Sequence, residues 1–205
     1  MERRSVTVNK PPARTLMILD QEAFQNAATA AGLQFKVFLA GPYIETTGKK
    51  PGRGEKNKAK RLRFALYHRL SELSWVVTMG EYKNLISAAN PLLGPRNNAA
   101  SAELLHAKNS ADAIVMLPSS PGSFLELGAF SLHSDVCRKM LIIIDKKHQA
   151  DDPNYLNTGP IPAAQLKGAL ALFIDYDDHD MCWESVEKFV VDQGHRVAEN
   201  KLLAP

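Results

Sequence analysis

The stretch that decides the fold is ADAIVMLPSSPGSFLELG at residues 111–128. Its apolar run at residues 113–117 has the length and β-branched content of a strand that is buried on both faces. A Pro-Ser-Ser-Pro-Gly-Ser turn follows, and a helical pattern then runs from Phe124 to about Ser134. In an open parallel sheet, such a junction lies at the carboxyl edge of the sheet, where ligands usually bind.

Glu126 falls in the first turn of this expected helix. The backbone N–H groups at a helix start favour an anion, and Gly122 would let a ligand approach the backbone. Glu126 therefore either contacts a ligand or only complements the positive end of the helix dipole, which is a common structural arrangement. Its position alone leaves both interpretations open.

The rest of the chain alternates between strand and helix patterns. Expected strands cover residues 36–40, 75–79, 113–117, 140–145 and 170–175. Expected helices cover residues 21–31, 98–109, 124–134 and 181–193. A further helix is expected after the basic loop, where leucines 62, 66, 70 and 73 share one face. This alternation predicts an α/β fold, a flavodoxin/Rossmann-like doubly wound parallel five-stranded sheet with helices on both faces. The expected strand order is 2-1-3-4-5, with a cleft between the first and third strands.

The intervening segments complete the expected organisation. Residues 1–34 should form an N-terminal arm and a helix capped by Asp20 and stopped by Gly32, and residues 35–200 one α/β domain. Residues 48–60 read as a mobile basic loop, residues 90–95 as a loop, and residues 151–160 as a polar loop.

Composition narrows the class of protein. The chain has 205 residues, 45% of them hydrophobic, which is enough for a full core. No apolar run approaches the roughly 18 residues of a membrane span, and the first residues lead into no apolar signal core. Cys137 and Cys182 are too few for a disulfide framework or a zinc cluster. We therefore expect a cytoplasmic protein with no membrane partner, no metal and no cofactor.

Several common chemistries find no support in the sequence. It contains neither a P-loop nor a G-x-S-x-G motif, and the G-x-G at residues 52–54 does not follow a strand directly. The acidic cluster at residues 175–180 lacks the glycine and the distal glutamate of a calcium loop, and we expect it to cap a helix.

A basic stretch gathers nine lysines and arginines within residues 49–69, against Glu55 as the only acid. Most of them are expected to lie on a solvated face. Arg61 and Arg63 begin the helix that follows, where fixed positive charge beside free N–H groups favours a phosphate. Each of the two is thus a candidate phosphate ligand or a solvated surface residue.

Two motifs resemble a known superfamily. Residues 37–43, VFLAGPY, resemble the opening strand and turn of nucleoside 2-deoxyribosyltransferase-like proteins. Residues 110–115, SADAIV, followed by residues 122–129, GSFLELGA, resemble the second motif of that superfamily. It includes deoxynucleotide N-glycosidases and toxin-like effectors of bacterial retron antiphage systems. The chain looks most similar to the retron effectors, through Leu62-Arg63, Gly80-Glu81 and residues 157–161.

The resemblance, which covers about residues 35–178, implies roles for individual residues. Glu126 matches the catalytic glutamate that attacks the anomeric carbon of the sugar. The loop that lines the base and sugar pocket corresponds to Gly41, Pro42 and Tyr43. The turn that holds the sugar or its 5′-phosphate corresponds to Gly122 and Ser123, and the substrate-binding candidates beside them are Ser119 and Ser120.

The chemistry that the resemblance implies needs a second group besides the nucleophile. Cleavage of an N-glycosidic bond builds positive charge on the sugar, which a carboxylate stabilises, and negative charge on the base, which needs a proton. Glu81 is the expected proton donor, and Glu103 and His106 are alternatives that we expect on the solvated face of their helix. Asp112, at the start of a strand, is expected to be a structural cap.

The expected function is therefore cleavage or transfer of the N-glycosidic bond of a nucleoside or nucleotide, with NAD as a further possible substrate. The expected partners are that substrate, a second copy of the chain in a homodimer or larger oligomer, and a defence-system component. The basic loop and the N-terminal extension favour a phosphorylated substrate. The alternatives are a non-catalytic nucleotide sensor, which would not need Glu126, and a scaffold subunit.

Overall fold

A parallel sheet forms the centre of the computed structural model, which describes residues 21–47, 51, 54–73, 75–80, 83–149 and 154–203, without the side chains of residues 21–25, 83 and 84. Its strands are β1 (Lys36–Ala40), β2 (Val76–Thr78), β3 (Ala113–Met116), β4 (Met140–Asp145) and β5 (Leu170–Ile174). Their order is β2-β1-β3-β4-β5, and every neighbouring pair is parallel. The predicted fold class and the predicted strand order are both confirmed.

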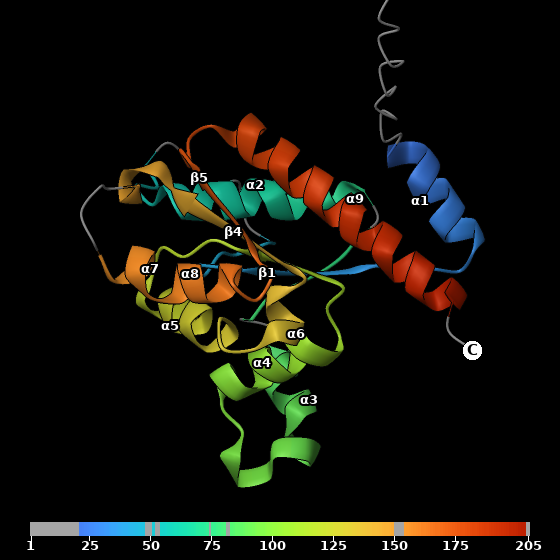
Figure 1. Cartoon of the computed structure of the whole chain (residues 1–205), viewed down its shortest axis with the longest axis horizontal. Helices are drawn as coiled ribbons and strands as arrows, with labels where there is room; N and C mark the ends of the chain where they lie inside the picture. Colours follow the sequence, from blue (N-terminus) through green and yellow to red (C-terminus); the bar gives the residue numbers. More distant parts are fainter. Residues whose placement is uncertain are drawn as a thin grey trace, which may run out of the picture.

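Helices cover both faces of the sheet (Figure 1). One face carries α1 (Gln21–Ala30), α2 (Lys58–Glu72) and α9 (His179–Leu203). The other face carries α4 (Ala99–Asn109), α5 (Pro121–Phe130), α6 (Ser134–Cys137) and α8 (Pro160–Gln165). Because side chains alternate along a strand, Val37 and Leu39 of β1 enter the first core while Phe38 and Ala40 enter the second.

Several boundaries differ from expectation. The expected loop at residues 90–95 is the end of α3 (Lys83–Leu93) followed by the 3₁₀-helix η1 (Gly94–Arg96). Pro91 is tolerated in the last turn of α3, where apolar residues at helical spacing pack against α4 and bury Ala89. The expected polar loop contains α7 (Tyr155–Thr158) and the start of α8, and the 3₁₀-helix η2 (Lys146–His148) follows β4 directly.

The ends of the described chain add two findings. Gly32 stops α1 with φ +66°, and the Leu33 N–H bonds back to the Ala28 carbonyl, as predicted for a glycine stop. The last helix extends to Leu203 because Val197 and Ala198 continue its apolar stripe against the core. The expected arm and the Asp20 cap lie outside the described residues. No helix in the described part of the chain is long and apolar enough to cross a membrane.

Candidate functional site

The carboxyl edge of the sheet has a topological switch point between β1 and β3. The chain leaves β1 toward α2 on one face and leaves β3 toward α5 on the opposite face. Two connections that diverge in this way open a crevice at the strand ends, where open α/β sheets bind ligands. The candidate site residues therefore come from the β1–α2 and β3–α5 connections and from the neighbouring strand ends.

The β3–α5 turn is held by its own serines. Ser120 caps α5, and its Oγ accepts the N–H of Ser123 at 3.3 Å. The buried Ser123 Oγ in turn accepts the N–H groups of Ser119 and Ser120, each at 2.9 Å. This capping box, with Pro121 in the first turn, makes α5 begin three residues earlier than Phe124, the expected start. Those two N–H groups are thus used inside the turn.

The earlier helix start moves Glu126 into the second turn of α5. The interpretation that Glu126 only complements the helix dipole is therefore less favoured, because the stabilisation of a negative charge by the dipole falls off within the first turn. Glu126 lies one turn before Phe130, whose ring centroid is 6.2 Å from that of Phe38 in β1. Since α5 runs back from the carboxyl edge, Glu126 is one turn nearer to that edge than Phe130. Its Oε2 atom is inaccessible to solvent.

The loop after β1 is held from inside the protein by Arg63. The Arg63 side chain is only 1% exposed, and its guanidinium donates to the Leu39 carbonyl at 2.5 Å and to the Pro42 carbonyl at 2.8 Å. Gly41 has φ +154°, and a Cβ there would lie 3.2 Å from Arg63 Cδ and 3.2 Å from Leu117 Cβ. This close approach requires glycine. Tyr43, which follows, is 63% exposed.

The location of Arg63 differs from the solvent-facing position expected of a phosphate ligand. Arg61 is also engaged within the protein, because it donates to the Glu55 carbonyl and pairs with Asp177 Oδ1 at 2.6 Å. Lys58 contacts Asp177 Oδ2 at 2.7 Å and Asp175 Oδ1 at 3.1 Å. Its hydrogen bond is the main cause that lowers the pKa of Asp177 below the usual range.

The acidic cluster therefore connects the β5–α9 loop to α2. Asp180 extends the same set of contacts by pairing with Arg69 at 3.0 Å. Across the described ranges, no group of three or more histidine, cysteine, aspartate or glutamate residues is arranged to hold a metal ion.

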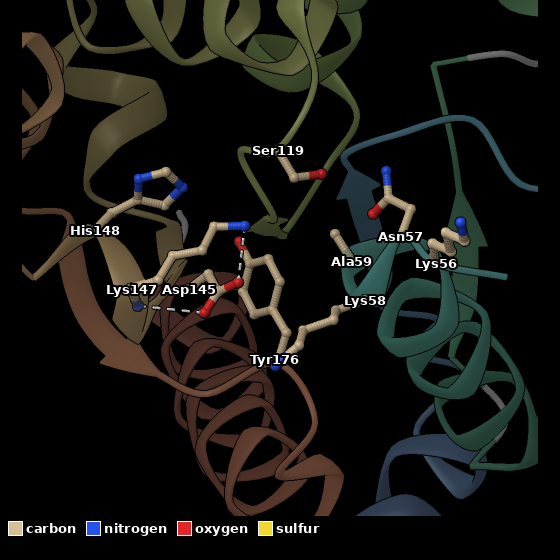
Figure 2. Close-up of a pocket in the computed structure, with 9 residues that line it drawn as sticks. All are labelled: Lys56, Asn57, Lys58, Ala59, Ser119, Asp145, Lys147, His148 and Tyr176. Carbon is tan, nitrogen blue, oxygen red and sulfur yellow. Dashed lines mark hydrogen bonds and ion pairs between the residues drawn. The ribbon is translucent and has the colours of Figure 1, made fainter. Parts of the chain in front are cut away.

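A pocket of about 420 Å³ lies at the carboxyl edge (Figure 2). Residues 56–59 at the start of α2 form one wall, Ser119 approaches from the β3–α5 turn, and Asp145, Lys147 and His148 come from the end of β4. Tyr176, which follows β5, closes the base and donates its hydroxyl to the Ile143 carbonyl at 2.8 Å. Burial raises the pKa of Tyr176 far above its usual value, so the phenol stays protonated.

The groups that face this pocket are mostly polar, and the described ones include three lysines against one aspartate. Asp145 is 3% exposed, accepts the Lys147 N–H at 3.3 Å, and lies 3.2 Å from the Lys147 ammonium, which reaches into the middle of the pocket (Figure 2). Lys56 is exposed and forms no ion pair with any residue that the structure describes. The Ser119 Oγ is buried and has no hydrogen-bond partner within the described ranges.

Two of the expected proton donors, Glu103 and His106, lie beside the second strand. Glu81 falls outside the described residues. Glu103 is 7% exposed, and its carboxylate lies so close to Gly80 that a Cβ there would be 2.2 Å from Oε1. Its position on a solvated face was therefore predicted wrongly. The i, i+3 spacing of Glu103 and His106, alongside buried Ala102 and Ala107, is the pattern that indicates a sheet-facing side.

His106 also faces the sheet, one turn after Glu103. Its Nε2 lies 2.8 Å from Thr78 Oγ1, and its ring meets Phe38 edge-on at 5.3 Å between centroids. Desolvation by burial lowers the pKa of His106, and the charges of Lys36 and Lys139 add to this effect. These contacts anchor α4 to β1 and β2. At the opposite edge of the sheet, Asp112 Oδ2 accepts the Lys36 N–H at 2.8 Å, as predicted for a structural cap.

Comparison with known proteins adds two findings. The pattern of the STM3845 retron effector protein family matches residues 58–201, from α2 to the last turn of α9. An Escherichia coli protein named "Retron Ec86 putative ribosyltransferase/DNA-binding protein" is 42% identical over 52 residues. That segment covers 25% of this chain and 17% of the E. coli protein. Because the family match spans well over half of its length, this chain belongs to the STM3845 retron effector family.

Proposed function

We propose that this protein cleaves or transfers the N-glycosidic bond of a nucleotide, with Glu126 as the nucleophile, and that it does so as an effector of bacterial defence. The observation that carries the proposal is the position of the Glu126 carboxylate. Its Oε2 atom is shielded from solvent, and the residue lies one helical turn nearer to the carboxyl edge of the sheet than Phe130, whose ring is 6.2 Å from that of Phe38 in β1. The name of the E. coli relative, which includes ribosyltransferase, and the resemblance to deoxyribosyltransferases support the same chemistry.

In the proposed reaction, a carboxylate oxygen of Glu126 bonds to the anomeric carbon as the bond from that carbon to the base nitrogen breaks. The departing base keeps the electron pair of that bond and takes up a proton from a carboxyl group. Water then attacks the anomeric carbon, releases Glu126 and returns a proton, or a second base takes the place of water in a transfer reaction. We assign the proton donor to Glu81 or to Glu103, which is buried beside Gly80 at the end of β2.

The loop after β1 is suited to hold the base. Arg63 fixes the Leu39 and Pro42 carbonyls from inside, so the loop is pre-organised before any ligand arrives. The Tyr43 ring is exposed at the end of this loop and offers an aromatic face for stacking. Gly122 at the start of α5 is exposed and has open space where a Cβ would be, so a sugar can approach the backbone there.

The test compares Glu126→Gln and Glu126→Ala with the wild type and with Glu184→Gln, an exposed glutamate on α9. Each protein is incubated with nucleosides, nucleotides and NAD, and released base is measured by chromatography. Wild type and Glu184→Gln should release base, and both Glu126 variants should not, while circular dichroism shows that all four are folded. Release at the wild-type rate by Glu126→Gln would refute the proposal.

A covalent intermediate gives an independent measurement. A 2-fluoro-arabinosyl nucleotide reacts slowly in the second step, so it should add the mass of one sugar phosphate to the peptide that contains Glu126. The adduct should be absent in Glu126→Ala. An adduct on any other peptide would place the nucleophile elsewhere.

One observation favours a second candidate function, a nucleotide sensor that does not cleave its ligand. The described residues that line the pocket provide cations and hydroxyls but do not include Glu126. A sensor binds nucleotide with this pocket alone, so its affinity is unchanged in Glu126→Ala and no base is released by the wild type. The base-release experiment separates the two functions.

A further inference from the structure

We infer that the pocket of Figure 2 is a subsite for a chain of two or more phosphates, so that the substrate is a nucleotide with a diphosphate or a longer phosphate group. The inference rests on the proposed function in one respect only, which is that the sugar and base of this nucleotide lie at Glu126. Phosphate binding in this pocket can be tested without catalysis.

The charges in the pocket select an anion. Lys56 projects from the segment before α2 and forms no ion pair with the described residues, so its charge is not compensated within them. The Lys147 side chain is 65% exposed, although Asp145 lies 3.2 Å from its ammonium. His148 stands beside it on η2. Lys58 contributes less, because Asp175 and Asp177 already hold its ammonium. The pocket thus presents cations from two separate connections.

The remaining polar group at the rim points to the same kind of ligand. Ser119 Oγ is buried, lacks a hydrogen-bond partner within the described ranges and borders the pocket. A buried hydroxyl without a partner is unfavourable, because it has lost its hydrogen bonds to water. An acceptor oxygen of a bound phosphate would satisfy it. Among the described residues of the lining, the only aliphatic side chain is that of Ala59, which is 1% exposed, so they offer little to an apolar ligand.

Size favours more than one phosphate. The volume of about 420 Å³ falls within the range of about 300–1,000 Å³ that is typical of small-molecule sites. Lys56 and Lys147 come from the connections after β1 and β4, the strands on either side of β3. A ligand that contacts both ammonium groups must therefore extend across the end of β3, which a diphosphate can do more readily than a single phosphate.

The pocket is joined to Glu126 through one turn of chain. The Ser119 N–H is held by Ser123 Oγ at 2.9 Å, and Ser123 precedes Glu126 by three residues on α5. A nucleotide with its sugar at Glu126 can therefore direct its 5′ side over the β3–α5 turn and into the pocket. Asp145 opposes a phosphate, and for this reason the phosphate has to bind on the side of the Lys147 ammonium that faces away from Asp145.

The test uses inorganic pyrophosphate and orthophosphate, which contain no glycosidic bond and cannot be turned over by the proposed reaction. Their binding is measured by calorimetry with the wild type, Lys56→Ala, Lys147→Gln and the control Lys188→Ala, an exposed lysine on α9. We expect pyrophosphate to bind more tightly than orthophosphate by at least tenfold. Each pocket variant should lose about tenfold to a hundredfold in affinity for pyrophosphate, as removal of a charged hydrogen bond predicts, and Lys188→Ala should match the wild type.

The outcomes separate the two proposals. Pyrophosphate that fails to bind, or that binds equally to wild type and both pocket variants, overturns the phosphate subsite, and base release that depends on Glu126 would then still support the proposed function. Binding that depends on Lys56 and Lys147, together with no base release from any substrate, supports the subsite and refutes the proposed function. Thermal melts of the variants exclude unfolding, and Lys56→Gln, which keeps the length of the side chain better, repeats the measurement if Lys56→Ala is unstable.

Discussion

Replacing Arg63 should destabilise the whole domain rather than merely weaken a ligand. Its guanidinium is buried, and it donates to the carbonyls of Leu39 and Pro42, two residues that are buried themselves. Substitution by Met keeps much of the volume of the side chain but removes both donors. Each buried carbonyl that loses its partner costs about 1–3 kcal/mol. The expected loss is therefore about 2–6 kcal/mol, which is a large part of the 5–15 kcal/mol that stabilises a typical domain.

The assay is urea unfolding followed by far-UV circular dichroism, with Arg61→Ala as the matched control. Arg61 lies two residues earlier on the same helix, but its partner Asp177 is about half exposed, and its other acceptor is the carbonyl of Glu55 in the nearby segment before α2. Such a pair contributes about 0.2–1 kcal/mol, so this control should unfold close to the wild type. Arg63→Lys should fall between wild type and Met, because one ammonium cannot reproduce the fork of a guanidinium.

A loss below about 1 kcal/mol for Arg63→Met would refute this reasoning. If that small loss came with weaker pyrophosphate binding, Arg63 would be the phosphate ligand that its sequence position suggested. If neither the free energy of unfolding nor the affinity for pyrophosphate changed, the buried hydrogen bonds of Arg63 would not stabilise the loop after β1.

Two further predictions follow from perturbed ionisation. Burial holds the pKa of His106 below its ordinary value of 6.5, so the unfolded chain binds more protons and stability falls as the pH drops below about 6.5 toward the folded-state pKa. His106→Gln should therefore flatten the loss of melting temperature between about pH 7 and about pH 5.5, and an unchanged slope would contradict this account. Burial raises the pKa of the Cys182 thiol to about 12 and that of Cys137 in the same direction. Both thiols should react slowly with a disulfide reagent in the folded protein and rapidly in urea, and rapid labelling without denaturant would show that the core around them opens.

The sheet could be predicted from the sequence because its signals are local. Each central strand is a short apolar run between turn residues, and alternation with helices limits the possible topologies to very few. The same local signals failed for α3, where Asn90 and Pro91 indicated a loop. There, tertiary packing of Ala89 against α4 outweighs the cost of a proline in the final turn. Predictions from local pattern are weakest where tertiary packing determines the secondary structure.

Some features of the candidate site could be predicted from the sequence, and others could not. The start of α5 could have been found from the sequence, since Ser120 followed by Pro121 and Ser123 is a readable capping signal. The role of Arg63 could not, because it depends on carbonyls more than twenty residues away along the chain. The ion pair of Lys58 with Asp177 joins residues that are 119 positions apart, and no spacing rule reports such a contact.

The lysines and arginines of the basic stretch thus have different structural roles, although the sequence did not distinguish them. Arg63 supports the loop after β1 from inside, and Arg61 and Lys58 connect α2 to the acidic loop after β5. Lys56 is left to face the pocket, where Lys147 joins it from the end of β4. These two lysines lie on either side of β3, and the β3–α5 turn also sets the position of Glu126. Phosphate binding and bond cleavage would therefore be coupled through that turn. When a ligand binds both lysines, the geometry of the β3–α5 turn alone would then determine where its sugar lies relative to Glu126.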